Sequence, residues 1–321
     1  MVLRFGLVFV FLYLVTVALN PSPISAFPKR VGTFWTTVRN ASNATSVASE
    51  MRPTLVVDRS PSSKVAGGTN ASKGQFSYLV AIVLNFGGGS EALCGGSIIS
   101  ESFILTAAHC LYGMEEATIV VGQNSKITLP IGDHNPTNAI IITIGPPNVI
   151  LHPGYDPVDI LNDIALILLP VVLPLRTSSA IQTIRLPSWN NAYTDLTGYD
   201  SIVSGWGAQS NEEFVDPTDE ASQIILRYAT SAIVPNEICR RVYGSLVRDQ
   251  QICVSGEGGR NPCQGDSGGP LTVKFGRQGI TQVGIVSYGS VKGCEKGVPG
   301  VYTRVSSYIE WIVHHAGIAV N

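Results

Sequence analysis

The strongest constraint on the fold is a series of short, β-rich runs that begins after residue 64. These runs are rich in β-branched and other apolar residues, and Gly, Pro, Asn and Asp separate them. They cover residues 78–86, 95–100, 103–108, 117–122, 163–169, 201–207, 224–234, 269–275, 281–289 and 300–305. Many short strands at this spacing are typical of an all-β sandwich or of a pair of barrels.

One helix is predicted, close to the C-terminal end of the chain. Tyr308, Trp311 and Ile312 form an apolar stripe at i, i+3 and i+4. Ser306 and Ser307 precede the stripe and are predicted to cap the helix. The chain is therefore expected to be all-β with a single C-terminal helix.

The first 64 residues differ in composition from the rest of the chain. An uncharged apolar run at 5–19 follows Arg4 and leads to a polar, Pro-rich stretch that ends at Ala26. Fifteen residues are too few for the ~20 that span a membrane, so residues 1–26 are interpreted as a secretory signal peptide rather than an anchor. Residues 27–64 are rich in Ser, Thr, Pro and Asn without periodicity, which predicts a disordered propeptide. The folded domain is expected at 65–321.

Charge and cysteine content narrow the class of protein further. A net charge of -2 lacks the basic excess that a nucleic-acid partner requires. Six cysteines in an oxidising compartment indicate disulfides, but six cysteines allow fifteen pairings, and spacing alone does not choose among them. The chain has no C-x-x-C pair to favour zinc. Three N-x-S/T sequons are candidate glycosylation sites: Asn40, Asn43 and Asn70.

Three residues are candidates for nucleophilic catalysis. His109 lies in "LTAAHC", Asp163 in "NDIALILL" and Ser267 in "GDSGGP", in that order along the chain. Acyl transfer by a serine needs a base, a group that orients the base, and donors for the oxyanion. Each residue also has a structural alternative: a core histidine, a strand-end cap and a turn serine.

From Val65 to the C-terminus the chain resembles the chymotrypsin-like (trypsin-fold) serine proteases. The resemblance is carried by "LTAAHC", "NDIAL", "SGWG", "CQGDSGGP", "SYG", "PGVYTRV" and "YIEWI". It implies two six-stranded antiparallel β-barrels with the site in the cleft between them. It also implies an endopeptidase in which Ser267 is the nucleophile, His109 the general base and Asp163 the group that orients His109, which is the standard mechanism of this family. The backbone N–H groups of Gly265 and Ser267 would form the oxyanion hole, and no metal or organic cofactor is required.

The resemblance also implies how the cysteines pair. The expected disulfides are Cys94–Cys110, Cys239–Cys253 and Cys263–Cys294. The first would hold the segment of His109, and the third would join the nucleophile loop to a wall of the substrate pocket. The loop at 121–133 lacks the acidic pair that a calcium site of the family would need.

The sequence "SSKVAGGTNAS" resembles the activation junction of these proteases. Cleavage after Lys64 would create a new N-terminus at Val65, whose ammonium group would pair with Asp266 and order the oxyanion loop. The alternative is an ordinary Gly-containing turn. Ala66 stands where the family usually has the larger Val, so it would bury less apolar surface.

Substrate preference is predicted from the pocket. Asn261, six residues before the nucleophile, stands at its base, where trypsin-like members have Asp. A neutral Asn does not compensate a buried cation. With small walls at Gly289 and Gly300, the pocket is predicted to prefer large apolar or aromatic side chains, as in chymotrypsin. The backbone of Ser287, Tyr288 and Gly289 is expected to pair with an extended substrate.

These predictions have consequences for partners. The expected partners are protein or peptide substrates, protein inhibitors and a trypsin-like activating protease, because an enzyme with this pocket would not cleave after Lys64 itself. A secreted, extracellular monomer without nucleic-acid or membrane partners is expected. The alternative class is a catalytically silent homologue that binds or regulates other proteins. A structural glycoprotein would rest on the sequons alone.

Overall fold

The computed structural model describes residues 68–123, 126–128, 139–190, 192–208 and 223–320. All of these residues belong to one compact unit. The predicted signal peptide (1–26), the predicted propeptide (27–64) and the residues of the predicted junction, Lys64, Val65 and Ala66, lie outside the described residues. Asn40 and Asn43 lie outside them too. In the described part of the chain, no helix has the length and apolar character needed to cross a membrane.

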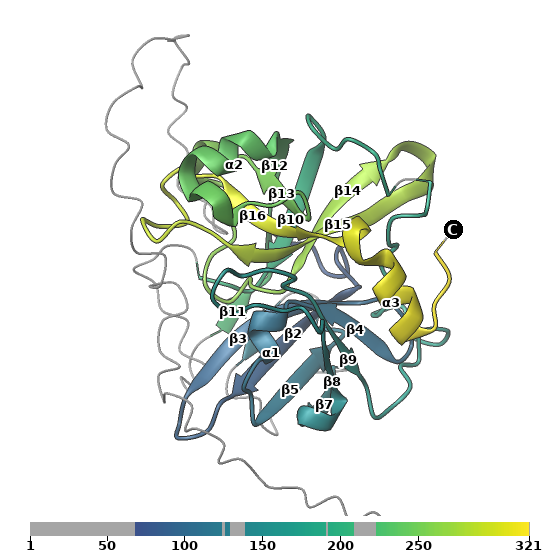
Figure 1. Cartoon of the computed structure of the whole chain (residues 1–321). Coiled ribbons are helices and arrows are strands. Elements are labelled where there is room, and N and C mark those ends of the chain that lie inside the picture. The colour runs from purple at the N-terminus through teal and green to yellow at the C-terminus, as the bar shows by residue number, and fades with distance from the viewer. Residues whose placement is uncertain (1–67, 124–125, 129–138, 191, 209–222, 321) are drawn as a thin grey trace, which may run out of the picture. The chain divides into compact units, whose positions relative to one another are not determined.

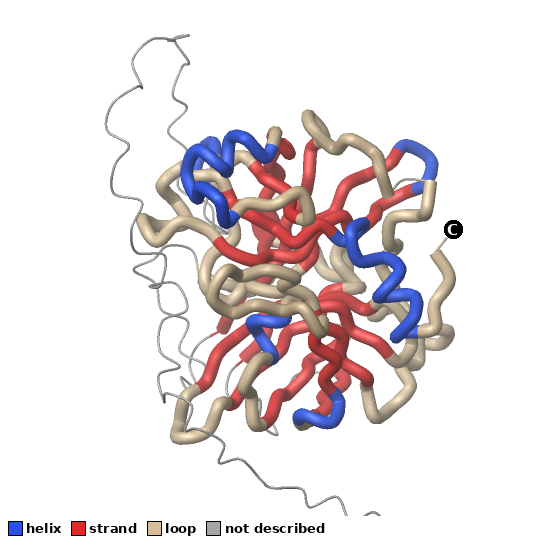
Figure 2. The backbone as a smooth tube through the Cα atoms, in the orientation of Figure 1, coloured by secondary structure: helices blue, strands red, loops and turns tan. Residues whose placement is uncertain are grey.

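Strands are the main regular secondary structure of the described residues (Figures 1 and 2). In chain order the elements are β1 (Thr69–Asn70), β2 (Leu79–Asn85), β3 (Glu91–Ile98), β4 (Phe103–Thr106), α1 (Ala108–Leu111), β5 (Glu116–Val121), β6 (Lys126–Thr128), β7 (Ile140–Ile144), β8 (Val149–Leu151), β9 (Ala165–Leu168), β10 (Asp200–Gly205), β11 (Gln223–Ile225), β12 (Arg227–Val234), α2 (Asn236–Tyr243), β13 (Gln251–Val254), β14 (Pro270–Phe275), β15 (Gly279–Tyr288), β16 (Gly300–Arg304) and α3 (Ile309–Ala316). Each of the ten predicted runs contains a strand. The prediction of an all-β chain is therefore confirmed.

The first sheet is antiparallel, in the order β7-β5-β2-β3-β4-β9-β8. Its two end strands, β7 and β8, are consecutive in the chain and are separated only by residues 145–148. Pro146 and Pro147 in this connection have no N–H to donate to a ladder, so they divide one long strand into two. Because β7 pairs with β5 and β8 with β9, the chain itself joins the two ends of the sheet into a barrel.

The second sheet is also antiparallel, in the order β1-β12-β10-β14-β15-β16-β13. A further pairing between β12 and β13 closes six of these strands into a ring, and β1 adds to the outside of β12. The prediction of two antiparallel barrels is confirmed. Each of these two sheets has seven strands rather than six, because one strand is interrupted in the first and an edge strand is added to the second, while β6 and β11 pair in a separate two-stranded sheet.

The C-terminal helix is confirmed, but its predicted caps are wrong. Ser306 and Ser307 lie in a 3-10 turn, and α3 begins at Ile309, after Tyr308 in the N-cap position without a side-chain cap. Ile309 and Ile312 are buried in the same core cluster as the apolar residues of the first sheet. The helix therefore follows directly from the last strand of the second sheet and covers the core of the first (Figure 1).

The two sheets are joined by buried polar and backbone contacts. Ser97 on β3 donates from Oγ to Oε1 of Gln282 on β15 at 2.6 Å, and both residues are fully buried. Gly95 on β3 lies so close to the loop before β14 that an added Cβ would come within 2.9 Å of the Gly269 Cα. These contacts hold β3 against β15 and against the loop before β14.

Candidate active site

Asp163 and His109 come from separate loops of the first sheet and meet in the structure. His109 lies on the short helix α1, directly after β4, and Asp163 lies just before β9. The backbone N–H of His109 donates to Asp163 Oδ1 at 2.9 Å, and His109 Nδ1 lies 2.8 Å from Asp163 Oδ2. Asp163 is 1 % exposed. Two contacts to one carboxylate fix both the position and the orientation of the imidazole.

Asp163 also accepts hydrogen bonds from two residues of the second sheet. Ser287 on β15 donates from Oγ to Oδ2 at 2.5 Å, and Thr303 on β16 donates from Oγ1 to the backbone carbonyl of Asp163 at 2.8 Å. Burial by itself would raise the pKa of Asp163, but the charge of His109 and the hydrogen bonds from His109 and Ser287 outweigh it, so the pKa is lowered. An ionised carboxylate only accepts hydrogen bonds, so Nδ1 of a neutral His109 carries the proton, and Nε2 is the nitrogen that can act as a base.

The loop of Ser267 packs against the segment that leads to His109. The backbone N–H of Gly95 donates to the Ser267 carbonyl at 2.7 Å, and Thr106 Oγ1 donates to the Gly95 carbonyl at 2.8 Å. The next residue, Gly268, has a φ of +76°, and an added Cβ would lie 2.2 Å from Thr106 Oγ1. Only glycine allows this approach, so Gly268 brings the loop of Ser267 onto the residues just before α1.

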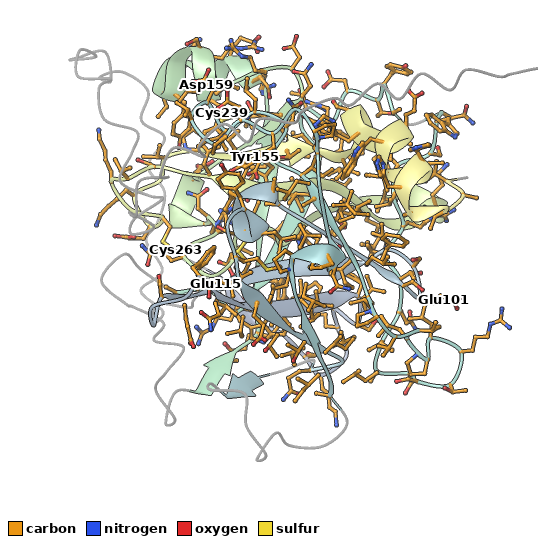
Figure 3. All side chains as sticks on the ribbon, turned by 60° about the horizontal axis from the view of Figure 1, so that its bottom comes forward. Glu101, Glu115, Tyr155, Asp159, Cys239 and Cys263 are labelled. Carbon is orange, nitrogen blue, oxygen red and sulfur yellow. A yellow bond between two sulfur atoms is a disulfide. The ribbon has the colours of Figure 1, made fainter. Side chains whose placement is uncertain are left out.

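The three disulfides join the pairs that the resemblance implies: Cys94–Cys110, Cys239–Cys253 and Cys263–Cys294. Figure 3 labels Cys239 and Cys263, one member each of the second and third. Cys94, His109 and Cys110 lie close enough together to resemble a metal-ligand group. Both sulfurs form the disulfide, so no thiolate remains to bind a metal ion there.

The backbone around Ser267 presents two donors. Gly265 has a φ of +93°, and an added Cβ would lie 2.9 Å from the Gly207 Cα, so this position requires glycine. The neighbouring N–H groups are used: Asp266 donates to the Cys263 carbonyl and Gly268 to the Val286 carbonyl. Within the described part of the chain, the N–H groups of Gly265 and Ser267 have no acceptor. Two such donors beside a serine hydroxyl can stabilise an oxyanion.

Asp266, next to Ser267, is a buried carboxylate that the proposed chemistry does not use. Its Oδ1 accepts the Gly207 N–H at 2.8 Å, and its Oδ2 accepts the Cys263 N–H at 2.9 Å. Burial raises the pKa of Asp266 to about 6, although these hydrogen bonds and the charge of Arg227 lower it. The site therefore lacks full compensation for a negative charge.

A pocket lies beside the loop of Ser267 and contains three of the predicted pocket residues. It is lined by Asn261, Pro262, Gly289, Ser290, Gly293, Cys294, Val298 and Gly300. Pro262 and Cys263 connect its base directly to the loop of Ser267. The sequence had indicated Asn261, Gly289 and Gly300, and the structure brings these three together.

Two residues of the predicted substrate-binding strand, Ser287 and Tyr288, are not in the described lining of that pocket. Ser287 instead contacts Asp163. Tyr288 is 6 % exposed, and its hydroxyl donates to the Leu246 carbonyl at 3.3 Å. Pairing of β14 with β15 ends at Pro270–Ile285, so the backbone at 287–289 extends past that ladder.

Among the predicted glycosylation sites, Asn70 lies within the described residues. It is exposed on β1, and its Oδ1 accepts a hydrogen bond from Arg227 Nε at 2.9 Å. This contact leaves the amide nitrogen, the atom to which a glycan would attach, on the other side of the group. Sequence reasoning had not identified Arg227, Thr303 or the side chain of Ser287, because their partners are distant in the chain.

Comparisons with known proteins agree with this fold. The family model described as Trypsin matches residues 65–312. Brachyurin of Leptuca pugilator is 36 % identical over 258 residues, which cover 79 % of this chain and 99 % of that protein. Chymotrypsin of Phaedon cochleariae is 36 % identical over 256 residues, which cover 80 % of this chain and 83 % of that protein. The solved structure of HL collagenase has a TM-score of 0.65 at 30 % identity and covers 78 % of this chain and 98 % of its own.

Proposed function

The chain belongs to the trypsin family and is a serine endopeptidase, and from that premise we propose that it is a secreted precursor that cleavage after Lys64 activates. The observation that carries the catalytic assignment is the bond of 2.8 Å between His109 Nδ1 and the buried Asp163 carboxylate, with the Ser267 loop packed against the same segment. We assign Ser267, His109 and Asp163 as the catalytic triad.

In this mechanism His109 Nε2 takes the proton of the Ser267 hydroxyl while Oγ attacks the scissile carbonyl carbon. The oxyanion of the tetrahedral intermediate accepts hydrogen bonds from the Gly265 and Ser267 N–H groups. His109 then gives its proton to the leaving amine, which leaves an acyl group on Ser267 Oγ. Water, deprotonated by His109, then attacks the ester carbon, and His109 returns this proton to Ser267 Oγ as the bond to the acyl group breaks and the acid product leaves. Asp163 stays ionised and stabilises the charged imidazole in both steps.

Asp266 is the proposed receptor of the activation signal. A buried carboxylate with a pKa of about 6 favours the approach of a cation. The ammonium group of Val65, released by cleavage after Lys64, would supply that cation. Asp266 lies between Gly265 and Ser267, whose N–H groups are the two oxyanion donors. The pairing of Asp266 with the ammonium group of Val65 would therefore fix both N–H groups in place.

The proposed substrates are proteins and peptides with a large apolar or aromatic residue before the scissile bond. The neutral base of the pocket at Asn261 and its small walls at Gly289 and Gly300 support this preference. The proposed enzyme is monomeric and extracellular. Its proposed partners, besides substrates, are an activating protease of trypsin-like specificity and protein inhibitors. Residues 1–26 support secretion through their composition, and Asn40, Asn43 and Asn70 are its candidate glycosylation sites.

The proposal is tested by activating the purified precursor with trypsin. We expect a new N-terminal sequence that begins at Val65 and the appearance of hydrolysis of peptides with Phe, Tyr or Leu before the scissile bond. The Lys64→Gln precursor should remain uncleaved at this site and inactive. The Ser267→Ala protein should be cleaved normally but stay inactive.

Two outcomes would contradict the proposal. Full activity of Lys64→Gln after the same treatment would show that the junction is elsewhere. A correctly cleaved wild-type protein without any hydrolysis would favour the silent homologue, a binding or regulatory protein.

A further inference from the structure

A second cavity, of about 240 Å³, lies against the segment of Asp163 and shares no lining residue with the pocket described above. Arg248 is exposed at its mouth, whereas Gln251, Thr303 and Tyr308 are buried and form a polar floor. Both sheets contribute to the lining, which consists of Leu161, Asn162, Asp163, Arg248, Gln250, Gln251, Thr303 and Tyr308. We call it the Arg248 cavity.

The floor of the Arg248 cavity contains the two hydroxyl groups that hold the segment of Asp163. Tyr308 donates from its hydroxyl to Asn162 Oδ1 at 3.0 Å, and Thr303 Oγ1 donates to the Asp163 carbonyl at 2.8 Å. Asn162 Nδ2 donates in turn to the Gly154 carbonyl at 2.6 Å. Asn162 has a φ of +52°, a conformation that costs free energy for a residue other than glycine. Its side-chain hydrogen bonds therefore hold a strained backbone directly before Asp163.

Arg248 brings an unpaired positive charge to the mouth of the cavity. Its backbone N–H donates to Gln251 Oε1, but its guanidinium group has no ion pair or hydrogen bond with the described part of the chain. The neighbouring acid, Asp249, is paired with Arg240 instead. A guanidinium group presents its N–H donors in a planar fork that matches a carboxylate. The cavity can therefore bind an anion at its mouth without breaking an existing ion pair.

We propose that the Arg248 cavity is an effector site for a small organic acid with a short apolar tail. The carboxylate of the acid pairs with the guanidinium group of Arg248. A carboxylate has about four lone-pair positions, so it can also accept hydrogen bonds from the hydroxyls of Tyr308 and Thr303. Leu161, the apolar side chain of the lining, contacts the tail.

The bound acid lowers the rate of hydrolysis, because it competes for the protons that position Asp163. Each hydroxyl has a single proton, which Tyr308 now shares with Asn162 and Thr303 with the Asp163 carbonyl. A charged acceptor forms stronger hydrogen bonds than a neutral amide or carbonyl oxygen. The acid therefore withdraws support from the residue that orients His109.

The charges of the lining select a monoanion. One guanidinium group offsets one negative charge, whereas a phosphate group carries nearly two. The excess charge of a phosphate would lie uncompensated in a cavity that also contains Asp163. A cation would be repelled by Arg248, and a neutral amide would lack the charge-assisted hydrogen bonds. A carboxylate is therefore the matching group.

Binding to the cavity is independent of the proposed protease function, but its effect on hydrolysis rests on that function. Binding is measured on the purified, uncleaved precursor by saturation-transfer NMR with butyrate as the probe. We expect a Kd on the order of millimolar, as is reasonable for an acid of about six heavy atoms. Butyramide, the neutral isostere, should bind at least tenfold more weakly, and inorganic phosphate should displace butyrate poorly. Equal binding of butyrate and butyramide, or displacement by an equal concentration of phosphate, would overturn the selection of a carboxylate.

Two variants locate the site. Arg248→Gln removes the guanidinium group, and its affinity for butyrate should fall at least tenfold. Arg241→Gln makes the same change at an exposed arginine of α2 that does not line the cavity, and its affinity should equal that of the wild type. Wild-type affinity in Arg248→Gln, or an equal loss in both variants, would overturn the assignment.

The effect on catalysis is measured on the trypsin-activated protein. Saturating butyrate should lower kcat about fivefold, the lower end of the coupling between distinct sites, and leave KM nearly unchanged. The same concentration should leave kcat of Arg248→Gln unchanged and lower kcat of Arg241→Gln as in the wild type. A rise in KM alone would show competition with the substrate, and binding without any change of kcat would show an inert site; either result would overturn the effector role.

The inference and the proposed function fail in different ways. If the precursor does not bind butyrate, the inference is overturned, while hydrolysis by the activated protein leaves the protease function intact. If the cleaved protein neither hydrolyses peptides nor reacts with a fluorophosphonate at Ser267, the protease function and the effect on catalysis are overturned together. The binding measurements on the precursor then still decide whether the cavity takes a carboxylate.

Discussion

The substitution Asp266→Asn tests the electrostatic basis of the proposed switch. In the structure this carboxylate is 1 % exposed, and its pKa is raised from 3.8 to about 6, mainly by burial. At 1.36 kcal/mol per pKa unit, this shift corresponds to about 3 kcal/mol. The folded precursor therefore binds a proton that the unfolded chain has already lost between about pH 4 and 6. Ionised Asp266 consequently lowers the free energy of unfolding as the pH rises through this range.

The assay is urea unfolding of the uncleaved precursor, in a Lys64→Gln background, at pH 4 and pH 7.5. Tryptophan fluorescence, to which the buried Trp206 contributes, would follow the transition. We expect the free energy of unfolding of the parent, minus that of its Asp266→Asn variant, to fall by about 2.5 kcal/mol between the two pH values. Asparagine does not titrate, so the comparison cancels other groups.

Asp163→Asn is the matched control, because the pKa of Asp163 is shifted in the opposite direction. A lowered pKa gives stability that is present above the unfolded value of 3.8 and is lost below it, so this difference should change little between pH 4 and 7.5. A difference for Asp266→Asn that is equally independent of pH, or that rises with pH, would refute the reasoning. It would mean that the buried carboxylate is already compensated before cleavage.

Three further substitutions test the site. Ser287→Ala removes the hydroxyl that donates to Asp163, and we expect kcat/KM to fall about tenfold in steady-state assays of protein that is still folded at the assay temperature; an unchanged kcat/KM would contradict the contact's role. Gly265→Ala adds a Cβ 2.9 Å from the Gly207 Cα, so peptide hydrolysis should fall at least 100-fold while activation cleavage still occurs. Asn261→Asp supplies a buried negative charge, and cleavage after Lys should rise relative to cleavage after Phe; a profile identical to the wild type would argue against this pocket.

Much of the fold follows from local sequence, but the parts that depend on pairing partners do not. The ten β-rich runs all contain strands because their apolar residues are consecutive and their ends are marked by turn residues. β7 and β8 were not predicted, since Pro146 and Pro147 divide the strand into two short pieces. α2 was also missed. Its eight residues include two arginines and a glutamate, and Cys239 and Tyr243 are its buried members.

In the candidate site, too, some features follow from local sequence and others depend on residues that are distant in the chain. His109, Asp163 and Ser267 stand in local patterns that indicate their chemistry, and the structure brings their segments together. The support of Asp163 by Ser287 and Thr303 comes from residues 124 and 140 positions away, through pairing that no local pattern encodes. The orientation of the Asn261 amide likewise depends on hydrogen bonds from its Nδ2 to the distant carbonyls of Cys294 and Val298.

The central claim is tested most directly by locating the adduct of a fluorophosphonate probe on the protein by peptide mass spectrometry. After cleavage behind Lys64, the account predicts one adduct per molecule, on Ser267. The uncleaved precursor and a cleaved His109→Ala variant should show almost none. An adduct on another serine, no adduct on the cleaved wild type, or equal labelling of the His109→Ala variant would contradict the account.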